Sequence, residues 1–177
     1  MTVLREVMRQ ELDGVAVAAI CDPEAVEMMA RAGVGATVTM ALGGRTDMPS
    51  IGLEGEPLTV TGRVRTLSDG EWIVRGPMYT GVKVTMGKSA VLDTGKVEIV
   101  IVSRHHEPWD QGVFTSLGID PARKRFLLLK SRIHYRAGFK PIASHIVECA
   151  GAGVTNADLS VYRYQKLRRP IWPLDPL

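Results

Sequence analysis

The sequence is poor in cysteine and in aromatic residues. Its two cysteines, Cys21 and Cys149, are far apart and lie outside any C-x-x-C spacing, and aromatic residues make up 6% of the chain. A disulfide framework and a cysteine metal site are therefore not indicated. We expect both thiols to behave as small buried hydrophobes.

Long apolar runs are also absent. No stretch reaches the roughly 18 apolar residues that a membrane-spanning helix needs. Arg5 and Glu6 place two charges where a secretory signal would be apolar. We therefore expect a cytoplasmic protein without a membrane partner. A length of 177 residues with 45% hydrophobic composition fits one globular domain over 1–177.

Most familiar catalytic motifs are missing. The turn after the first expected strand is Cys21-Asp22-Pro23 and not a G-x-G-x-x-G loop, and neither H-E-x-x-H nor G-x-S-x-G occurs. His105 and His106 are neighbours before Glu107, and adjacent strand residues point to opposite faces, so at most His105 and Glu107 share a face. We therefore prefer an exposed strand end to a metal site for this group. No residue is assigned as catalytic or as a metal ligand. No RRM, KH or helix-turn-helix pattern points to nucleic acid.

The first forty residues predict a helix and then a strand-helix-strand unit. Thr2 is the expected cap of the first helix, and Asp22 followed by Pro23 is a strong start signal for the second. The apolar run over 15–20 and the stretch over 36–42 predict strands. This βαβ order favours a parallel pair with a right-handed crossover.

The middle of the chain is rich in predicted strands. Alternating residues over 59–67, the turn at Ser68-Asp69-Gly70 and the apolar 72–74 predict a hairpin. We predict a loop over 151–158 and no helix in the proline-rich 168–174. The fold class is therefore α/β (mixed α+β), with a βαβ unit at the N-terminal end and a β-rich middle in a single domain. Further strands are predicted at 82–86, 90–92, 97–103 and 126–129, with a short helix from Asp110 to Leu117.

Charge is unevenly distributed along the chain. Residues 1–122 hold 11 basic and 16 acidic side chains, whereas residues 123–177 hold 11 basic and 3 acidic ones. A basic last third attracts carboxylates, phosphates or an acidic partner surface. An ordinary solvated basic face is the alternative.

The densest polar cluster follows the predicted strand over 126–129. Open α/β sheets bind ligands at the carboxyl ends of their strands. Lys130, Ser131 and His134 could converge there on a carboxylate, with Arg136 as a bidentate clamp. A solvated basic helix start beside a capping serine is the competing interpretation. The turn at Gly43-Gly44 could hold an anion through exposed amides.

Many short motifs occur together in the order seen in one family, and they extend from about Leu4 to Asp175. The motifs are DPEAV at 22–26, AGVGA at 32–36, LGG at 42–44 with Asp47, LSDG at 67–70, GPM at 76–78, GIDP at 118–121, KS at 130–131, HYR at 134–136 and RPIWPLD at 169–175. With these motifs the chain resembles the C-terminal domain of the microcystin LR degradation protein (MlrC, microcystinase C) family. Within that pattern, Lys130, Ser131, His134 and Arg136 match the run K-S-x-x-H-[FY]-R, and Gly43-Gly44 matches the turn L-G-G.

The resemblance implies a part of a larger enzyme. Family members carry zinc-binding His, Asp and Glu residues in a larger N-terminal domain, against which a C-terminal domain like this one packs. We therefore expect no cofactor in this chain, which is inactive alone, and a partner N-terminal domain supplied in cis or in trans. The implied role is to bind small peptide or amide substrates in a shared cleft through Lys130, Ser131, His134, Arg136, Gly43 and Gly44.

Two further expectations concern partners. A C-terminal domain alone exposes the surface that normally meets its partner, so we expect self-association, with Pro77, Met78 and Tyr79 as candidate patch residues. The alternative function is a non-catalytic binding or assembly module that docks an acidic partner through the basic last third.

Overall fold

The strands form one mixed sheet and a small hairpin. The computed structural model describes residues 1–149, 151, 153, 156 and 158–176, and most of the predicted loop over 151–158 lies outside these residues. The main sheet has six strands in the order β2-β3-β6-β7-β1-β8, and β4 (Glu71–Ile73) pairs only with β5 (Lys83–Thr85). The sheet strands are β1 (Val15–Cys21), β2 (Thr37–Leu42), β3 (Leu58–Ser68), β6 (Ser89–Asp93), β7 (Val97–Val102) and β8 (Phe126–Leu129).

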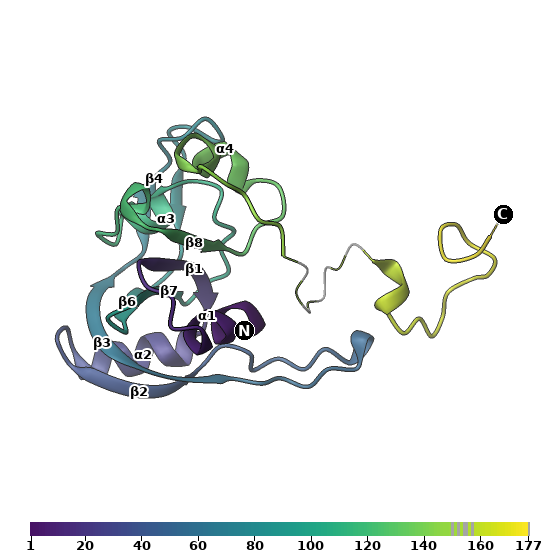
Figure 1. Ribbon diagram of the computed structural model, residues 1–177, viewed down its shortest axis with the longest axis horizontal. Helices are drawn as coiled ribbons and strands as arrows, with labels where there is room; N and C mark the ends of the chain where they lie inside the picture. The colour runs from purple at the N-terminus through teal and green to yellow at the C-terminus, as the bar shows by residue number, and fades with distance from the viewer. Residues whose placement is uncertain (150, 152, 154–155, 157, 177) are drawn as a thin grey trace.

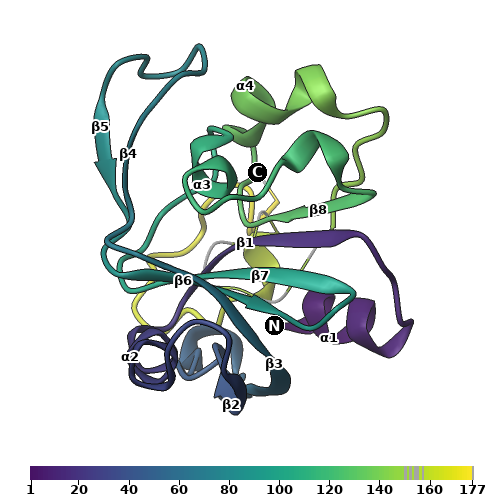
Figure 2. The ribbon, with the colours of Figure 1, turned by 90° about the vertical axis from the view of Figure 1, so that its left-hand side faces the viewer.

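Helices cover both faces of the sheet. In Figure 2 α1 (Thr2–Arg9) and α2 (Pro23–Ala32) lie on one side, and α3 (Gly112–Thr115) and α4 (Tyr135–Phe139) on the other. Alternate residues of β1 enter the two cores, with Val15 and Val17 packing toward α2 and Ala16 and Ala18 toward α3. Burial on both faces explains why this strand reads as a continuous apolar run. The α/β class and the single domain are confirmed.

The predicted parallel pairing within the strand-helix-strand unit is wrong. The succession β1, α2, β2 is present, but β1 runs parallel to β7 and β8, and β2 pairs antiparallel with β3. All residues of β7 are buried, whereas β2 alternates exposed and buried positions. A strand buried on both faces fits the centre of the sheet beside β1, and an alternating strand fits its edge.

The predicted hairpin between β3 and β4 is also wrong. The turn at Ser68-Asp69-Gly70 does form, because Ser68 Oγ accepts the Gly70 amide at 3.0 Å. Trp72 of β4, however, is buried against α3, where a Cβ on Gly112 would lie 2.1 Å from the indole. Burying this large side chain in the second core takes β4 away from β3, and β5 becomes its partner.

Asp22 joins α2 to the end of β2. Its buried carboxylate, 1% exposed, accepts the Ala25 amide at 3.1 Å, which confirms the predicted helix start. The second oxygen accepts the Gly43 amide at 2.8 Å and Nε of Arg45 at 3.0 Å. In Figure 1 β2 passes beside α2, and the hydrogen bond from Gly43 to Asp22 joins the end of β2 to the start of α2. The predicted cap at Thr2 is wrong, because α1 begins at Thr2 and Met1 takes the cap position without a side-chain hydrogen bond.

Two segments extend away from the domain body in Figure 1. The arm is residues 43–57 between β2 and β3, and the tail is residues 158–176. The Arg163 amide of the tail donates to the Ser50 carbonyl of the arm at 2.7 Å. As predicted, the proline-rich 168–174 forms no helix. Among the described residues, no helix is long and apolar enough to cross a membrane.

We predict that Asp22→Ala lowers the free energy of unfolding by about 2–4 kcal/mol, because it removes a helix cap and leaves the buried Gly43 amide without its acceptor. Urea unfolding followed by circular dichroism measures this change. Asp120→Ala is the matched control, since Asp120 caps a short turn through Ala122 but is exposed. The control should lose about 1 kcal/mol or less. Equal losses in the two variants would contradict the joining role of Asp22.

Candidate functional site

Three parallel strands bring three distant segments to one edge of the sheet. Cys21 of β1 lies opposite Val102 of β7, and Ala18 lies opposite Leu129 of β8. The segments that follow these strands, 22, 103–109 and 130–134, therefore meet at their carboxyl ends. The predicted strand over 126–129 is confirmed, and α4 begins directly after the polar turn that follows it.

Ser131 and His134 meet on the carboxylate of Glu107. Ser131 Oγ donates to Glu107 Oε1 at 2.5 Å, and His134 Nδ1 lies 3.0 Å from Oε2 and 3.1 Å from Oε1. Ser131 Oγ also accepts the Tyr135 amide at 3.0 Å at the start of α4. The serine is thus both a cap and a member of a polar cluster. We call Glu107, Ser131 and His134 the Glu107 cluster.

Glu107 was not identified from the sequence as a site residue. Partial burial alone would raise the pKa of Glu107, but hydrogen bonds from Ser131 and His134 outweigh burial and hold the pKa below its usual value. Its carboxylate is therefore ionised at neutral pH. The sequence feature that could have pointed to Glu107 is its position shortly after β7. This position becomes informative only once β7 and β8 are known to run parallel.

His105, His106 and Glu107 do not form the predicted exposed strand end. β7 ends at Val102, so these residues form a loop. His105 is exposed as expected, but His106 packs between Trp72 and Trp109, with ring centroids 5.6 and 4.5 Å away. Burial lowers the pKa of His106 from 6.5 to about 4, so the ring is neutral at neutral pH.

Lys130 and the Gly43-Gly44 turn lie beside the end of β1. The Lys130 amide donates to the Ala18 carbonyl at 3.2 Å, and a Cβ on Gly43 would lie 3.1 Å from Ile20. Burial raises the pKa of the Cys21 thiol, Asp22 raises it further, and the charge of Lys130 opposes this rise. The expected exposed amide at Gly43 is wrong, because this residue is buried and its N–H donates to Asp22. Anion binding by the rest of the turn stays a prediction.

Arg136 pairs with Glu148, which is not a member of the Glu107 cluster. Its Nη2 donates to Glu148 Oε1 at 2.5 Å, and its guanidinium lies 5.6 Å from the centre of the Tyr135 ring. Ser131 and His134 thus share Glu107, and Arg136 pairs with Glu148, while substrate binding by Lys130, Ser131, His134 and Arg136 stays a prediction. The expectation that both cysteines are buried is also wrong, since Cys21 is partly buried and Cys149 is exposed.

The donor set does not fit a zinc ion. Among the described residues, no group of three or more His, Cys, Asp or Glu side chains could hold a metal. Glu107 and His134 supply one carboxylate and one imidazole, whereas protein zinc sites use at least three protein ligands. We therefore assign no metal to Glu107 and His134 and derive no step through one.

The chain is similar to one protein family, to one characterised protein and to one crystal structure. It matches the family described as MlrC C-terminus over residues 1–166. It is 26% identical to microcystinase C of a Sphingomonas species over 177 residues, which cover 100% of this chain and 32% of that protein. A crystal structure from Mesorhizobium sp. BNC1, provisionally described as a metallopeptidase, has the same fold with a TM-score of 0.81 and 24% identity. The match covers 98% of this chain and 34% of that one, so the chain spans about a third of both relatives.

We predict that His106 makes the fold sensitive to acid. The folded state holds the ring neutral down to about pH 4, whereas the unfolded state takes up a proton near pH 6.5, so stability is full above 6.5 and is lost as the pH falls toward 4. His106→Phe keeps an aromatic ring but cannot titrate. Urea unfolding should therefore show a smaller loss between pH 6.5 and pH 4 for this variant than for the wild type. The control His105→Phe, at an exposed position, should keep the wild-type dependence, and the same loss in all three proteins would contradict the assignment.

Proposed function

The chain belongs to the MlrC C-terminus family, and from this membership we propose that it is the C-terminal domain of an MlrC-type metallohydrolase acting on small peptides or amides. The domain contributes substrate-binding residues to a cleft that it shares with a metal-bearing partner domain. The observation that carries this proposal is the position of the family's K-S-x-x-H-[FY]-R run at the carboxyl ends of three parallel strands.

Each residue of that run has a proposed role. Lys130 supplies a positive charge near the end of β1 for a substrate carboxylate, and Ser131 and His134 supply polar atoms for peptide oxygens. Arg136 is held by an exposed ion pair with Glu148, and such pairs contribute little, so the guanidinium is able to exchange Glu148 for a substrate carboxylate. Gly43 and Gly44 shape the neighbouring turn. None of these residues is proposed to be catalytic.

The zinc of the full-length family belongs, in this proposal, to the partner N-terminal domain. Two observations support this assignment. The described residues of this chain form no group that could hold a metal, and the chain spans about a third of its relatives. The remaining two thirds of such a protein have ample length for a separate metal-binding domain.

The arm and the tail are the proposed docking surface for that domain. Both extend from the body on one side, and they expose large apolar side chains, among them Leu53, Tyr164 and Trp172, which is 69% exposed. Apolar surface displayed on extended segments indicates a protein partner. We also propose that the chain alone self-associates through these exposed apolar side chains. At the candidate patch, Pro77 and Tyr79 are exposed and Met78 is partly buried, and the Tyr79 ring lies edge-on to Trp109.

Docking of an acidic partner by the basic last third is less well supported. Several cations of this segment already pair with acidic side chains of the chain itself, which reduces the positive charge offered to a partner. These are Lys124 with Glu98, Arg125 with Asp13, Arg136 with Glu148 and Arg169 with Asp175.

Mixing the chain with an MlrC-type N-terminal domain tests the proposed function. We expect zinc-dependent hydrolysis of a small peptide by the mixture and no hydrolysis by either part alone. In the mixture, Lys130→Ala and His134→Ala should each raise KM or lower kcat at least about tenfold, which corresponds to about 1.4 kcal/mol of lost transition-state stabilisation. Steady-state kinetics measure both parameters.

Lys140→Ala is the matched control for this experiment. Lys140 is an exposed cation just after α4, and no substrate contact is assigned to it. The control should keep wild-type kinetics. Wild-type kinetics in the Lys130 and His134 variants, or full activity of the N-terminal domain alone, would contradict a shared cleft.

A further inference from the structure

The carboxylate of Glu107 determines which nitrogen of His134 carries a proton. An ionised carboxylate can only accept hydrogen bonds. One oxygen of the Glu107 carboxylate accepts a hydrogen bond from Ser131 Oγ. His134 Nδ1 lies 3.0 Å from Oε2 and 3.1 Å from Oε1 of the same carboxylate. Nδ1 must therefore bear the hydrogen. In the neutral ring the second nitrogen, Nε2, then carries the lone pair.

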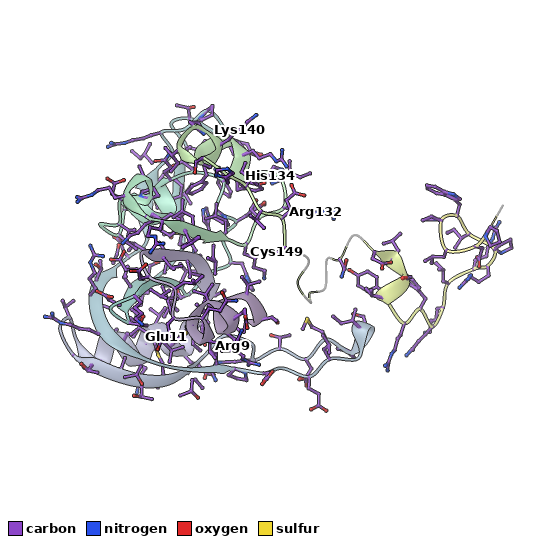
Figure 3. The ribbon with its side chains drawn as sticks, in the orientation of Figure 1. Arg9, Glu11, Arg132, His134, Lys140 and Cys149 are labelled. Atoms are coloured by element: carbon purple, nitrogen blue, oxygen red, sulfur yellow. The ribbon has the colours of Figure 1, made fainter. Side chains whose placement is uncertain are left out.

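The His134 ring is held at one end and open at the other. Its side chain is 53% exposed, and within the described part of the chain only Nδ1 makes a hydrogen bond. In Figure 3 His134 and Arg132 lie on the side of the body toward the arm and the tail. Nε2 is therefore the ring atom that remains for a ligand or a partner domain arriving from that side.

Neighbouring contacts fix Glu107 itself. Ser131 Oγ links the carboxylate to the start of α4, because the same oxygen accepts the Tyr135 amide at 3.0 Å. On the other side, His106 precedes Glu107 and packs against Trp72 and Trp109. The carboxylate is thus placed by two packed segments, as is typical of groups that orient a functional histidine.

We propose that Glu107 is a positioning residue that holds the imidazole of His134 through Nδ1, so that Nε2 is the atom offered to the peptide or amide substrate. This inference rests on the proposed function and identifies the atom through which His134 acts. With a neutral ring Nε2 accepts from a substrate amide N–H. With a protonated ring Nε2 donates to a carbonyl or carboxylate oxygen, and the adjacent Glu107 balances the ring charge.

Nitrogen-15 NMR of the histidine rings tests the proposal in the chain itself. At about pH 8.5, where histidine is neutral, correlation of ring protons with ring nitrogens distinguishes the Nδ1–H tautomer from the Nε2–H tautomer. A His134→Gln variant assigns the His134 signals among the four histidines. We expect His134 in the wild type as the Nδ1–H tautomer. A wild-type ring in the Nε2–H form would overturn the proposal, whatever any variant does.

Variants separate the carboxylate from general effects on the fold. Glu107→Ala should convert His134 to the Nε2–H form, whereas Glu107→Gln, whose amide oxygen can still accept, should retain the Nδ1–H form in part. Glu148→Ala removes a nearby carboxylate that pairs with Arg136 and should leave the tautomer unchanged. An unchanged tautomer in a folded Glu107→Ala protein would also overturn the proposal.

Binding of N-acetylglycine, a small amide with a free carboxylate, gives the second readout. Titration should shift the Nε2 resonance of His134 in the wild type and should shift it at least about tenfold less in Glu107→Ala. No shift in the wild type would contradict Nε2 as the ligand-facing atom. If His134 is the Nδ1–H tautomer but the mixture with an MlrC-type N-terminal domain is inactive, the positioning role of Glu107 stands and the proposed function is refuted. Failure of the positioning role and failure of the proposed function are therefore distinguishable.

Discussion

Burial of β1 on both faces is the constraint on which the rest of the structure depends. Its small residues Ala16 and Ala18 allow α3 to pack closely, while Val15 and Val17 contact the core beneath α2. A strand with two covered faces needs hydrogen-bonded neighbours on both edges, and here β7 and β8 supply them in parallel. Three segments separated widely in the chain consequently end at one edge, where Glu107 meets Ser131 and His134.

Local sequence signals predicted most elements but not their pairing. Asp22 before Pro23 located the start of α2, and the apolar runs located β1, β7 and β8, because capping and burial depend on neighbouring residues. Strand order depends on contacts between distant residues, which spacing does not encode. The β3–β4 hairpin failed for this reason, since the burial of Trp72 under α3 decided the position of β4.

Only the part of the candidate site that depends on local sequence was predicted. Position after an apolar strand was enough to select Ser131 and His134 as candidates, because β8 and α4 are adjacent in sequence. Glu107 became visible only when the parallel alignment of β7 and β8 was known. The partners that Arg136 and Gly43 have within the chain, Glu148 and Asp22, were not predicted from the sequence. Such competition among polar groups is a property of the three-dimensional structure.

The arm and the tail give the domain an asymmetric shape. The body with its buried core lies on one side, and extended segments with exposed Leu53, Tyr164 and Trp172 lie on the other. His134 faces toward this second side. A partner domain seated on the arm and the tail would therefore also approach the carboxyl ends of β1, β7 and β8. The proposed docking surface and the proposed substrate site thus belong to one face.

Hydrogen-deuterium exchange of the chain, measured with and without an MlrC-type N-terminal domain, tests this central claim most directly. The account predicts slower exchange in the presence of that domain at 103–109 and 130–136 and in the arm, with unchanged exchange in the β4–β5 hairpin. No change at the carboxyl edge, or protection confined to the β4–β5 hairpin, would contradict it.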